Sequence, residues 1–169
     1  MPHLQPRLAM RPKTHLYVPT SVLAAIYQEG WTHCPLETGG ILLGHQQGTR
    51  IQITHTIGPG PKASHERYGF TPDDTWQAEQ TARIWSAHPE TQYLGDWHTH
   101  PGGRPRPSPL DQKTLRTIAD HAPARQPTPV MLILALNTDG TTDTRAVQLK
   151  NNHIRPLQVG VTADQASPS

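Results

Sequence analysis

The sequence is poor in cysteine, in aromatic residues and in long apolar runs. Cys34 is its only cysteine among 169 residues, so no internal disulfide can form. The N-terminus also lacks the basic-then-apolar pattern of a secretory signal, and we expect a cytoplasmic protein. The longest apolar run covers 130–136 and is far too short to cross a bilayer, so we expect no membrane association.

Neither positive nor negative charge is in large excess. The formal net charge is +2 with neutral histidines, and the charged residues alternate in sign along the chain. We therefore expect no nucleic-acid partner. Only 34% of the residues are hydrophobic and 18 are proline, so the core must come from a few concentrated segments of a single domain.

Hydrophobic periodicity predicts the N-terminal elements. A helix is expected from about Thr20 or Ser21, with Gly30 as its C-cap glycine. The segments 40–44 and 51–57 predict a hairpin that turns at Gly48.

The middle of the chain predicts a long loop over 58–70 and then a second helix. Thr71 resembles a capping residue, because proline follows it at the first helical position. The face of this helix with Ala78, Ala82 and Trp85 is expected to pack on the core.

The C-terminal half predicts a strand over 93–100, a third helix from Pro109, a buried strand over 130–136 and a last strand over 145–149. These elements indicate an α/β sandwich on a mixed sheet. The expected domain covers 14–155, with disordered segments at 1–13 and 156–169.

The segment from Gly95 to Asp111 contains the pattern His-x-His-x7-Ser-x2-Asp. Alternate side chains of a strand share a face, so His98 and His100 point to one place. The proline- and glycine-rich loop after them can return the chain, so that the third helix presents Asp111 there. Two nitrogens and one oxygen suit Zn²⁺, and the open fourth position admits a water.

Zinc catalysis also needs a base to take a proton from that water. Glu37 is the candidate, because it precedes two glycines that let the backbone pass close to the site. The same acid would later give the proton to the leaving amine.

Glu37, His98-x-His100, Ser108 and Asp111 stand in the order of the JAMM (MPN-type, or JAB) zinc metallopeptidase signature, and the chain resembles that family. The phrases around Glu37 and His98 are most similar to the bacterial branch associated with ubiquitin-like conjugation operons, including anti-phage systems. The resemblance implies an MPN (cytidine-deaminase-like) sandwich, with a mixed central sheet flanked by about three helices. It also implies one Zn²⁺ held by His98, His100 and Asp111, catalysis by Glu37, and an oxyanion hydrogen bond from Ser108.

The implied activity is hydrolysis after the C-terminal glycine of a ubiquitin-like protein or its conjugate, in deconjugation or precursor processing. The implied partners are this modifier and the activating and conjugating enzymes of the same operon. The substrate tail is expected to bind extended at a sheet edge, between walls formed by 58–70 and 102–107.

Simpler interpretations exist for each residue. A His-x-His pair can arise by chance among 11 histidines, and Ser108 with Asp111 also fits an ordinary helix start. Asp96 shares the histidine face and is either an outer-shell partner or a polar residue at the sheet end. Cys34 is better explained as a buried thiol than as a ligand.

Two other functions remain open. The first is a non-catalytic MPN scaffold that binds a partner through the same groove, although such proteins usually lack some of the ligands that are all present here. The second keeps the metal chemistry and acts on an adduct of a sulfur-carrier protein, whose terminus would fit the same site.

Overall fold

The described part of the chain contains three α-helices of 12 to 14 residues and nine strands of 3 to 10 residues. The computed structural model describes residues 11–164. None of the helices in this range is long and apolar enough to cross a membrane. The strands are β1 His15–Pro19, β2 Gly39–Gln47, β3 Arg50–Ile57, β4 Ser64–Glu66, β5 Gly69–Thr71, β6 Gln92–Pro101, β7 Val130–Leu136, β8 Thr142–Lys150 and β9 His153–Thr162, and the helices are α1 Thr20–His33, α2 Asp74–Ala87, α3 Pro109–Asp120 and the short 3₁₀ turn Ala122–Ala124.

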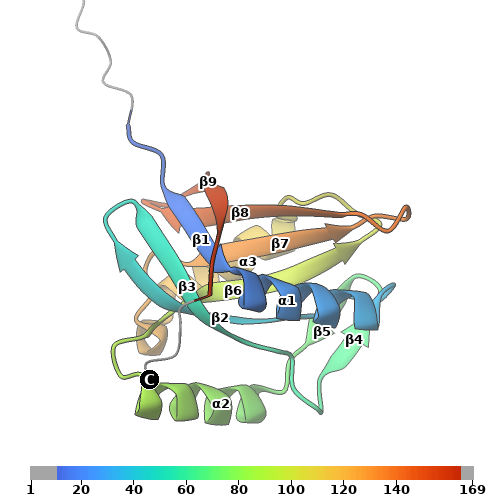
Figure 1. The fold of residues 1–169 in the computed structure, drawn as a ribbon, viewed down its shortest axis with the longest axis horizontal. Helices are drawn as coiled ribbons and strands as arrows, with labels where there is room; N and C mark the ends of the chain where they lie inside the picture. Colours follow the sequence, from blue (N-terminus) through green and yellow to red (C-terminus); the bar gives the residue numbers. More distant parts are fainter. Residues whose placement is uncertain (1–10, 165–169) are drawn as a thin grey trace, which may run out of the picture.

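The main sheet closes on itself in the order β1-β3-β2-β6-β7-β8-β9, while β4 and β5 form a separate hairpin. Closure is made by a parallel pairing of β1 with β9. The expected sandwich is therefore corrected to a barrel-like mixed sheet flanked by three α-helices (Figure 1). The two strands that close it are those that the sequence did not predict.

The expected domain end at residue 155 is also wrong, since β9 continues to Thr162. The sequence does not show the hydrophobic alternation of a strand here, because Leu157 is the only buried residue of β9. Pro156 and Gly160 are also unusual in a strand. The disorder expected at 1–13 and after 156 can be compared only in part, because residues 1–10 and 165–169 lie outside the described range.

β7 is the centre of the packing, and every one of its residues is buried. One face, with Leu132 and Leu134, joins the larger core cluster with Val22 and Ile26 of α1. The other face, with Ile133, packs with Leu115 and Ala119 of α3 in a second cluster. Figure 1 accordingly shows α1 in front of the sheet and α3 behind it, with α2 below. The uninterrupted apolar run is therefore explained by cover on both faces.

The predicted hairpin and the strands at 93–100 and 130–136 are confirmed. β2 and β3 pair in antiparallel register around Gly48, which has a positive φ of 58°. β6 pairs with β7 in parallel. The expected loop over 58–70 is partly wrong, because it contains the β4–β5 hairpin.

The predicted boundaries of the first helix are corrected at Gly30. α1 continues through this glycine to His33. A Cβ there would lie 3.0 Å from the Thr99 side chain, so Gly30 lets the helix approach β6 and does not end it.

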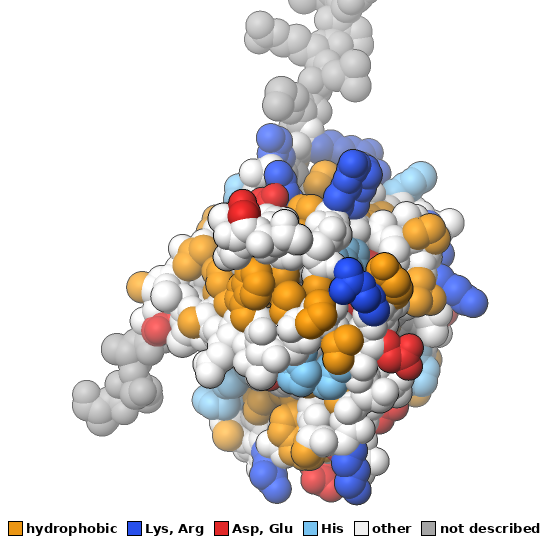
Figure 2. All heavy atoms as spheres, turned by 90° about the vertical axis from the view of Figure 1, so that its right-hand side faces the viewer, with side chains coloured by type: hydrophobic (Ala, Val, Ile, Leu, Met, Phe, Trp, Pro, Cys, Tyr) orange, Lys and Arg blue, Asp and Glu red, His pale blue; other side chains and the backbone are white. Residues whose placement is uncertain are grey.

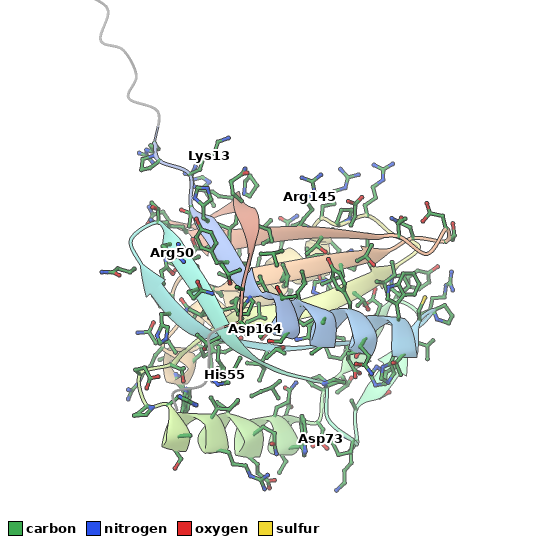
Figure 3. All side chains as sticks on the ribbon, in the orientation of Figure 1. Lys13, Arg50, His55, Asp73, Arg145 and Asp164 are labelled. Atoms are coloured by element: carbon green, nitrogen blue, oxygen red, sulfur yellow. The ribbon has the colours of Figure 1, made fainter. Side chains whose placement is uncertain are left out.

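The second helix starts and packs differently from the prediction. Asp73, labelled in Figure 3, is its N-cap. The Asp73 side chain accepts a hydrogen bond from the Trp76 backbone N–H at 3.2 Å. Ala78, Ala82 and Trp85 are exposed, whereas Gln77 is buried and donates to the Gly58 carbonyl at 2.9 Å. The helix is positioned by a polar contact, which hydrophobic periodicity cannot detect.

Gly95 on β6 lies in close contact with the backbone of β7, and a substitution there tests how tightly the two strands pack. It has a φ of 149°, and a Cβ would lie 1.9 Å from the Val130 carbonyl oxygen. We expect Gly95→Ala to lower the free energy of unfolding by about 2 kcal/mol or more, from backbone strain and displacement of β7. Gly58→Ala is the control, because nothing lies within 4 Å of a Cβ there. Urea unfolding measures both, and equal stabilities would contradict this account.

Candidate active site

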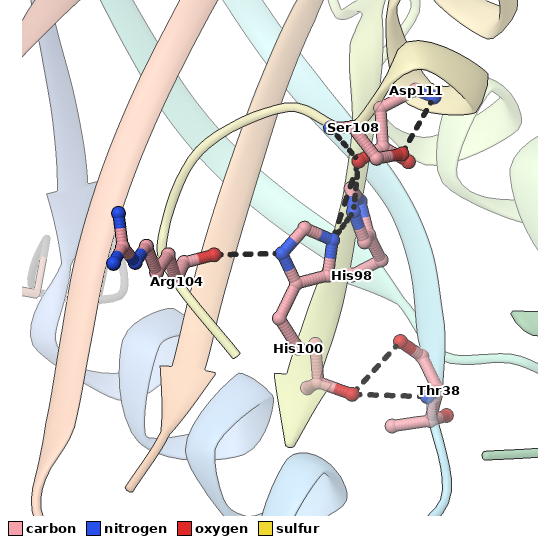
Figure 4. Close-up of polar contacts among 7 residues, drawn as sticks. Thr38, His98, His100, Arg104, Ser108 and Asp111 are labelled. Carbon is pink, nitrogen blue, oxygen red and sulfur yellow. Dashed lines mark hydrogen bonds and ion pairs between the residues drawn. The ribbon is translucent and has the colours of Figure 1, made fainter. Parts of the chain in front are cut away.

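β6 presents two histidines on the face that is turned toward α3. Its alternate residues Trp97 and Thr99 point the other way and are 1% and 0% exposed. Thr99 is bonded to the residue before β2, because its Oγ1 accepts the Thr38 backbone N–H at 3.0 Å (Figure 4) and its own backbone N–H donates to the Thr38 carbonyl at 2.9 Å. This double contact places Glu37, one residue earlier, beside the histidine face of β6.

The first turn of α3 presents Asp111 to the same place. Ser108 is the N-cap of the helix, and its Oγ accepts the Asp111 backbone N–H at 3.1 Å. The Asp111 carboxylate in turn accepts the Ser108 backbone N–H at 2.7 Å, which completes a capping box. The ordinary helix start and the metal-ligand interpretation are thus compatible, because the cap itself orients the carboxylate.

Three potential ligand atoms converge at this point. The Nε2 atoms of His98 and His100 are 2.8 Å apart. Asp111 Oδ2 lies 3.3 Å from the first and 3.2 Å from the second. Among residues 11–164 these three form the one group of His, Cys, Asp or Glu whose geometry could hold a metal ion. The predicted ligands are therefore brought together, although they come from elements that are separated by the seven-residue loop 102–108.

The second nitrogen of His100 has its own partner. His100 Nδ1 lies 2.8 Å from the Arg104 carbonyl oxygen (Figure 4). A carbonyl can only accept, so the neutral ring carries its proton on Nδ1 and turns the Nε2 lone pair toward Asp111. The sequence analysis missed this contact, because a backbone acceptor has no side-chain signature.

The electrostatics of the cluster favour a cation. Burial alone would raise the pKa of Asp111, but hydrogen bonds from His100 and His98 outweigh it and hold the pKa well below its usual range. Burial lowers the pKa of His100, but the hydrogen bonds to Asp111 and Arg104 outweigh it and raise the pKa. Positive charge is stabilised at this point, whether a proton or a metal ion carries it.

Glu37 lines the same cavity, as expected for a base. Burial raises the pKa of its carboxyl from 4.5 to about 7, while His100 lowers it and Asp111 raises it further. A carboxyl with such a pKa can both take and give a proton near neutral pH. Its backbone is fixed by the β4–β5 hairpin, because its N–H donates to the Glu66 carbonyl at 2.8 Å and its carbonyl lies 3.0 Å from His65 Nδ1.

The cavity around these groups has a volume of about 630 Å³. One wall is the β4–β5 hairpin with Tyr68 and Phe70, and the opposite wall includes Gly102 and Leu110. Tyr68 is 84% exposed and Leu110 64% exposed, so the rim offers apolar surface to a ligand. Figure 2 views the end of the molecule at which β6 ends, and it shows a hydrophobic patch there. Both segments expected as groove walls thus contribute to the cavity.

Asp96 and Cys34 are placed differently from the three ligands. Asp96 lines the cavity, but its carboxylate accepts a hydrogen bond from the Tyr93 hydroxyl at 2.8 Å. Burial raises its pKa to about 6, and the Tyr93 bond lowers it in part. An outer-shell role for Asp96 stays a prediction. Cys34 is partly buried against the larger core cluster, in agreement with the simpler interpretation.

Known proteins with similar sequences include a metalloprotease and an isopeptidase, by their names. A protein of Sinorhizobium fredii named "Probable metalloprotease y4qB" is 37% identical over 123 residues, which cover 70% of this chain and 74% of that protein. A "CD-NTase/cGAS isopeptidase" of Pseudomonas aeruginosa is 32% identical over 98 residues, or 57% of this chain and 62% of that protein. This match thus spans slightly less than two thirds of the isopeptidase.

The fold has a counterpart among solved structures. A protein from Desulfitobacterium hafniense, solved in solution, superposes with a TM-score of 0.69 at 16% identity, over 88% of this chain and 94% of that one. Such low identity shows the fold alone. The family described as "Prokaryotic homologs of the JAB domain" matches residues 19–150, and these residues include Glu37, His98, His100, Ser108 and Asp111. The chain belongs to the prokaryotic homologs of the JAB domain.

Proposed function

We propose that the protein is a zinc-dependent isopeptidase or peptidase that cleaves after the C-terminal glycine of a ubiquitin-like protein or its conjugate. The observation that carries this proposal is the convergence of two imidazoles and one carboxylate beside a half-buried acid, Glu37, with a pKa of about 7. The family, and relatives named as a metalloprotease and an isopeptidase, support the broader class of JAB-type hydrolase.

The residues present fit zinc. Tetrahedral ligands at about 2.0 to 2.1 Å from Zn²⁺ are separated by about 3.3 to 3.4 Å. The carboxylate lies 3.3 and 3.2 Å from the two imidazole nitrogens, which agrees closely. The imidazole nitrogens, 2.8 Å apart, would have to separate by about half an ångström. When bound, zinc would supply a water with a pKa of about 7 and polarise the scissile carbonyl.

The protein groups divide the remaining work. Glu37 takes a proton from the attacking water and returns it to the leaving amine, because its pKa of about 7 allows both directions. Ser108 uses its oxygen to accept the Asp111 N–H, which leaves its hydroxyl proton free to donate to the carbonyl oxygen as charge develops. The Arg104 carbonyl keeps His100 in the required tautomer.

The shape of the cavity supports an extended chain as substrate. An opening between a hairpin wall and a glycine-containing loop suits a narrow glycine tail, and the exposed Tyr68 and Leu110 suit contacts with the residues before it. Because several relatives are named CD-NTase/cGAS isopeptidases, the conjugate proposed for this chain is one of a CD-NTase-like protein, in an anti-phage setting.

Metal removal tests the proposal. We expect about one zinc per chain by elemental analysis, loss of hydrolysis after dialysis against a chelator, and recovery on adding Zn²⁺. The substrate is a ubiquitin-like protein fused through its C-terminal glycine to a reporter. Zinc at about 100 times its Kd should also raise the free energy of unfolding by about 2.7 kcal/mol. A protein that folds, binds no zinc and cleaves no fusion would contradict the proposal.

A further inference from the structure

We propose that a groove beside the active-site loop, lined by Arg104, Arg106 and Arg145, binds an acidic segment of the protein substrate. The inference rests on the proposed function, because it assigns the segment to the substrate of that site. The groove has a volume of about 430 Å³ and lies between the loop after β6 and the strands β8 and β9. None of its ten lining residues carries a carboxylate: they are Arg104, Pro105, Arg106, Pro107, Arg145, Ala146, Val147, Pro156, Leu157 and Gln158.

The side chains of the three arginines form no ion pair within the part of the chain that the structure describes. All four ion pairs among residues 11–164 involve histidine, so neither lysine nor arginine contributes to any of them. The three side chains are exposed. Arg145 projects outward from β8 in Figure 3, and Figure 2 shows basic side chains along the same upper edge. Like charges that share a groove repel each other, so this arrangement favours an anionic ligand.

The groove is continuous with the active site through one loop. Gly102 and Gly103 line the catalytic cavity, and the next four residues line the groove. Arg104 belongs to both surfaces, because its carbonyl accepts the proton of His100 Nδ1 while its side chain points away from the histidines (Figure 4). A ligand in the groove therefore lies next to the chain that is being cleaved.

The chemistry of the groove favours a peptide over a nucleic acid. The prolines Pro105, Pro107 and Pro156 contribute apolar surface to the lining between the arginines, and Val147, 8% exposed, lies on the same strand face as Arg145. A peptide can combine carboxylates with apolar side chains on such a surface. A nucleic-acid backbone favours a long basic stripe, and the net charge of this chain is only +2.

Fluorescence anisotropy with two labelled peptides tests the groove without any need for turnover. One peptide alternates glutamate with leucine and proline, and its twin has glutamine in place of glutamate. We expect Arg104→Gln/Arg106→Gln/Arg145→Gln to weaken binding of the glutamate peptide by about tenfold or more, since three charge pairs are lost. The difference should disappear in 1 M NaCl, where the Debye length is about 3 Å.

The matched control is Lys13→Gln/Lys62→Gln/Arg83→Gln, which removes the same charge from exposed positions outside the groove. It should leave affinity within about twofold. Equal binding of the two peptides, or equal losses in the two triple variants, overturns the inference. An oligonucleotide that binds more tightly than the glutamate peptide through the same arginines overturns it in favour of a nucleic acid.

Hydrolysis then tests the assignment to the substrate. Fusions carry the glutamate segment on one side or the other of the scissile bond. We expect Arg106→Gln/Arg145→Gln, which leaves Arg104 and its contact with His100 intact, to raise KM for one placement, with kcat unchanged. If neither placement depends on the arginines, the segment does not belong to the substrate. If the peptides bind through the arginines but no fusion is cleaved by the zinc-loaded protein, the proposed function fails and the groove remains a site for acidic peptides.

Discussion

Glu37→Gln is expected to lower kcat by about 10²- to 10⁴-fold while zinc stays bound, because the amide cannot take a proton from water. Elemental analysis and turnover of the ubiquitin-like fusion measure the two effects separately. Glu66→Gln is the matched control, since this glutamate is exposed on the neighbouring hairpin and lies outside the catalytic cavity. Comparable activity of the Glu37 variant and the control would remove Glu37 from the mechanism.

The same substitution should stabilise the metal-free protein at alkaline pH. The folded-state pKa of about 7 lies above the ordinary value of 4.5, so folding favours the protonated acid. That contribution is complete below pH 4.5 and is lost as the pH rises through about 7. In the absence of metal, Glu37→Gln should therefore have a higher Tm than the wild type, and this difference should be larger at pH 8 than at pH 5. A Tm difference that does not change with pH would show that Glu37 does not resist ionisation.

Asp111→Asn is expected to abolish stoichiometric zinc binding and, with it, turnover. The asparagine can still accept the Ser108 N–H, so the start of α3 is kept, but the anionic ligand is lost. We expect zinc affinity to fall by more than about 100-fold, beyond the loss that follows removal of an outer-shell partner. Competition with a chelating dye measures this affinity.

Ser108→Ala gives the complementary result. It removes the hydroxyl that accepts the Asp111 N–H and should lower the free energy of unfolding by about 1 kcal/mol. Zinc binding should persist, because the three ligand side chains are unchanged. If both variants lost zinc equally, the capping geometry would be the requirement and not the charge of Asp111.

The sequence predicted the residues of the candidate site more completely than it predicted the strands and helices of the fold. Strand alternation placed His98 and His100 on one face from local geometry alone. The placement of Asp111 at the same point depended on the loop that returns the chain and on the family resemblance. The contact between Thr38 and Thr99 and the contact between His100 and the Arg104 carbonyl could not be predicted from the sequence. Each contact joins a side chain to a backbone atom, and the position of that backbone atom is decided by how the chain packs or by the path of an irregular loop.

The fold was predictable where a segment is buried on a regular pattern. β7 was identified because both its faces are covered, whereas β9 was missed because Leu157 is its only buried residue. The buried face of α2 was assigned wrongly for a related reason, since the helix docks through Gln77 and leaves Trp85 45% exposed. Hydrophobic periodicity reports burial, and it fails for elements that are held by polar contacts or by strand pairing.

The attachment of Glu37 to the β4–β5 hairpin has a mechanical consequence. The hairpin supplies Tyr68 and Phe70 to one wall of the cavity. Glu66 and His65 of the same hairpin also form hydrogen bonds with the backbone of Glu37. A tail that pushes this wall outward would carry the proton acceptor away from the attacking water, and one that draws it inward would bring the two together. How well a tail fits the groove would thus set the rate of the proton transfer as well as the strength of binding.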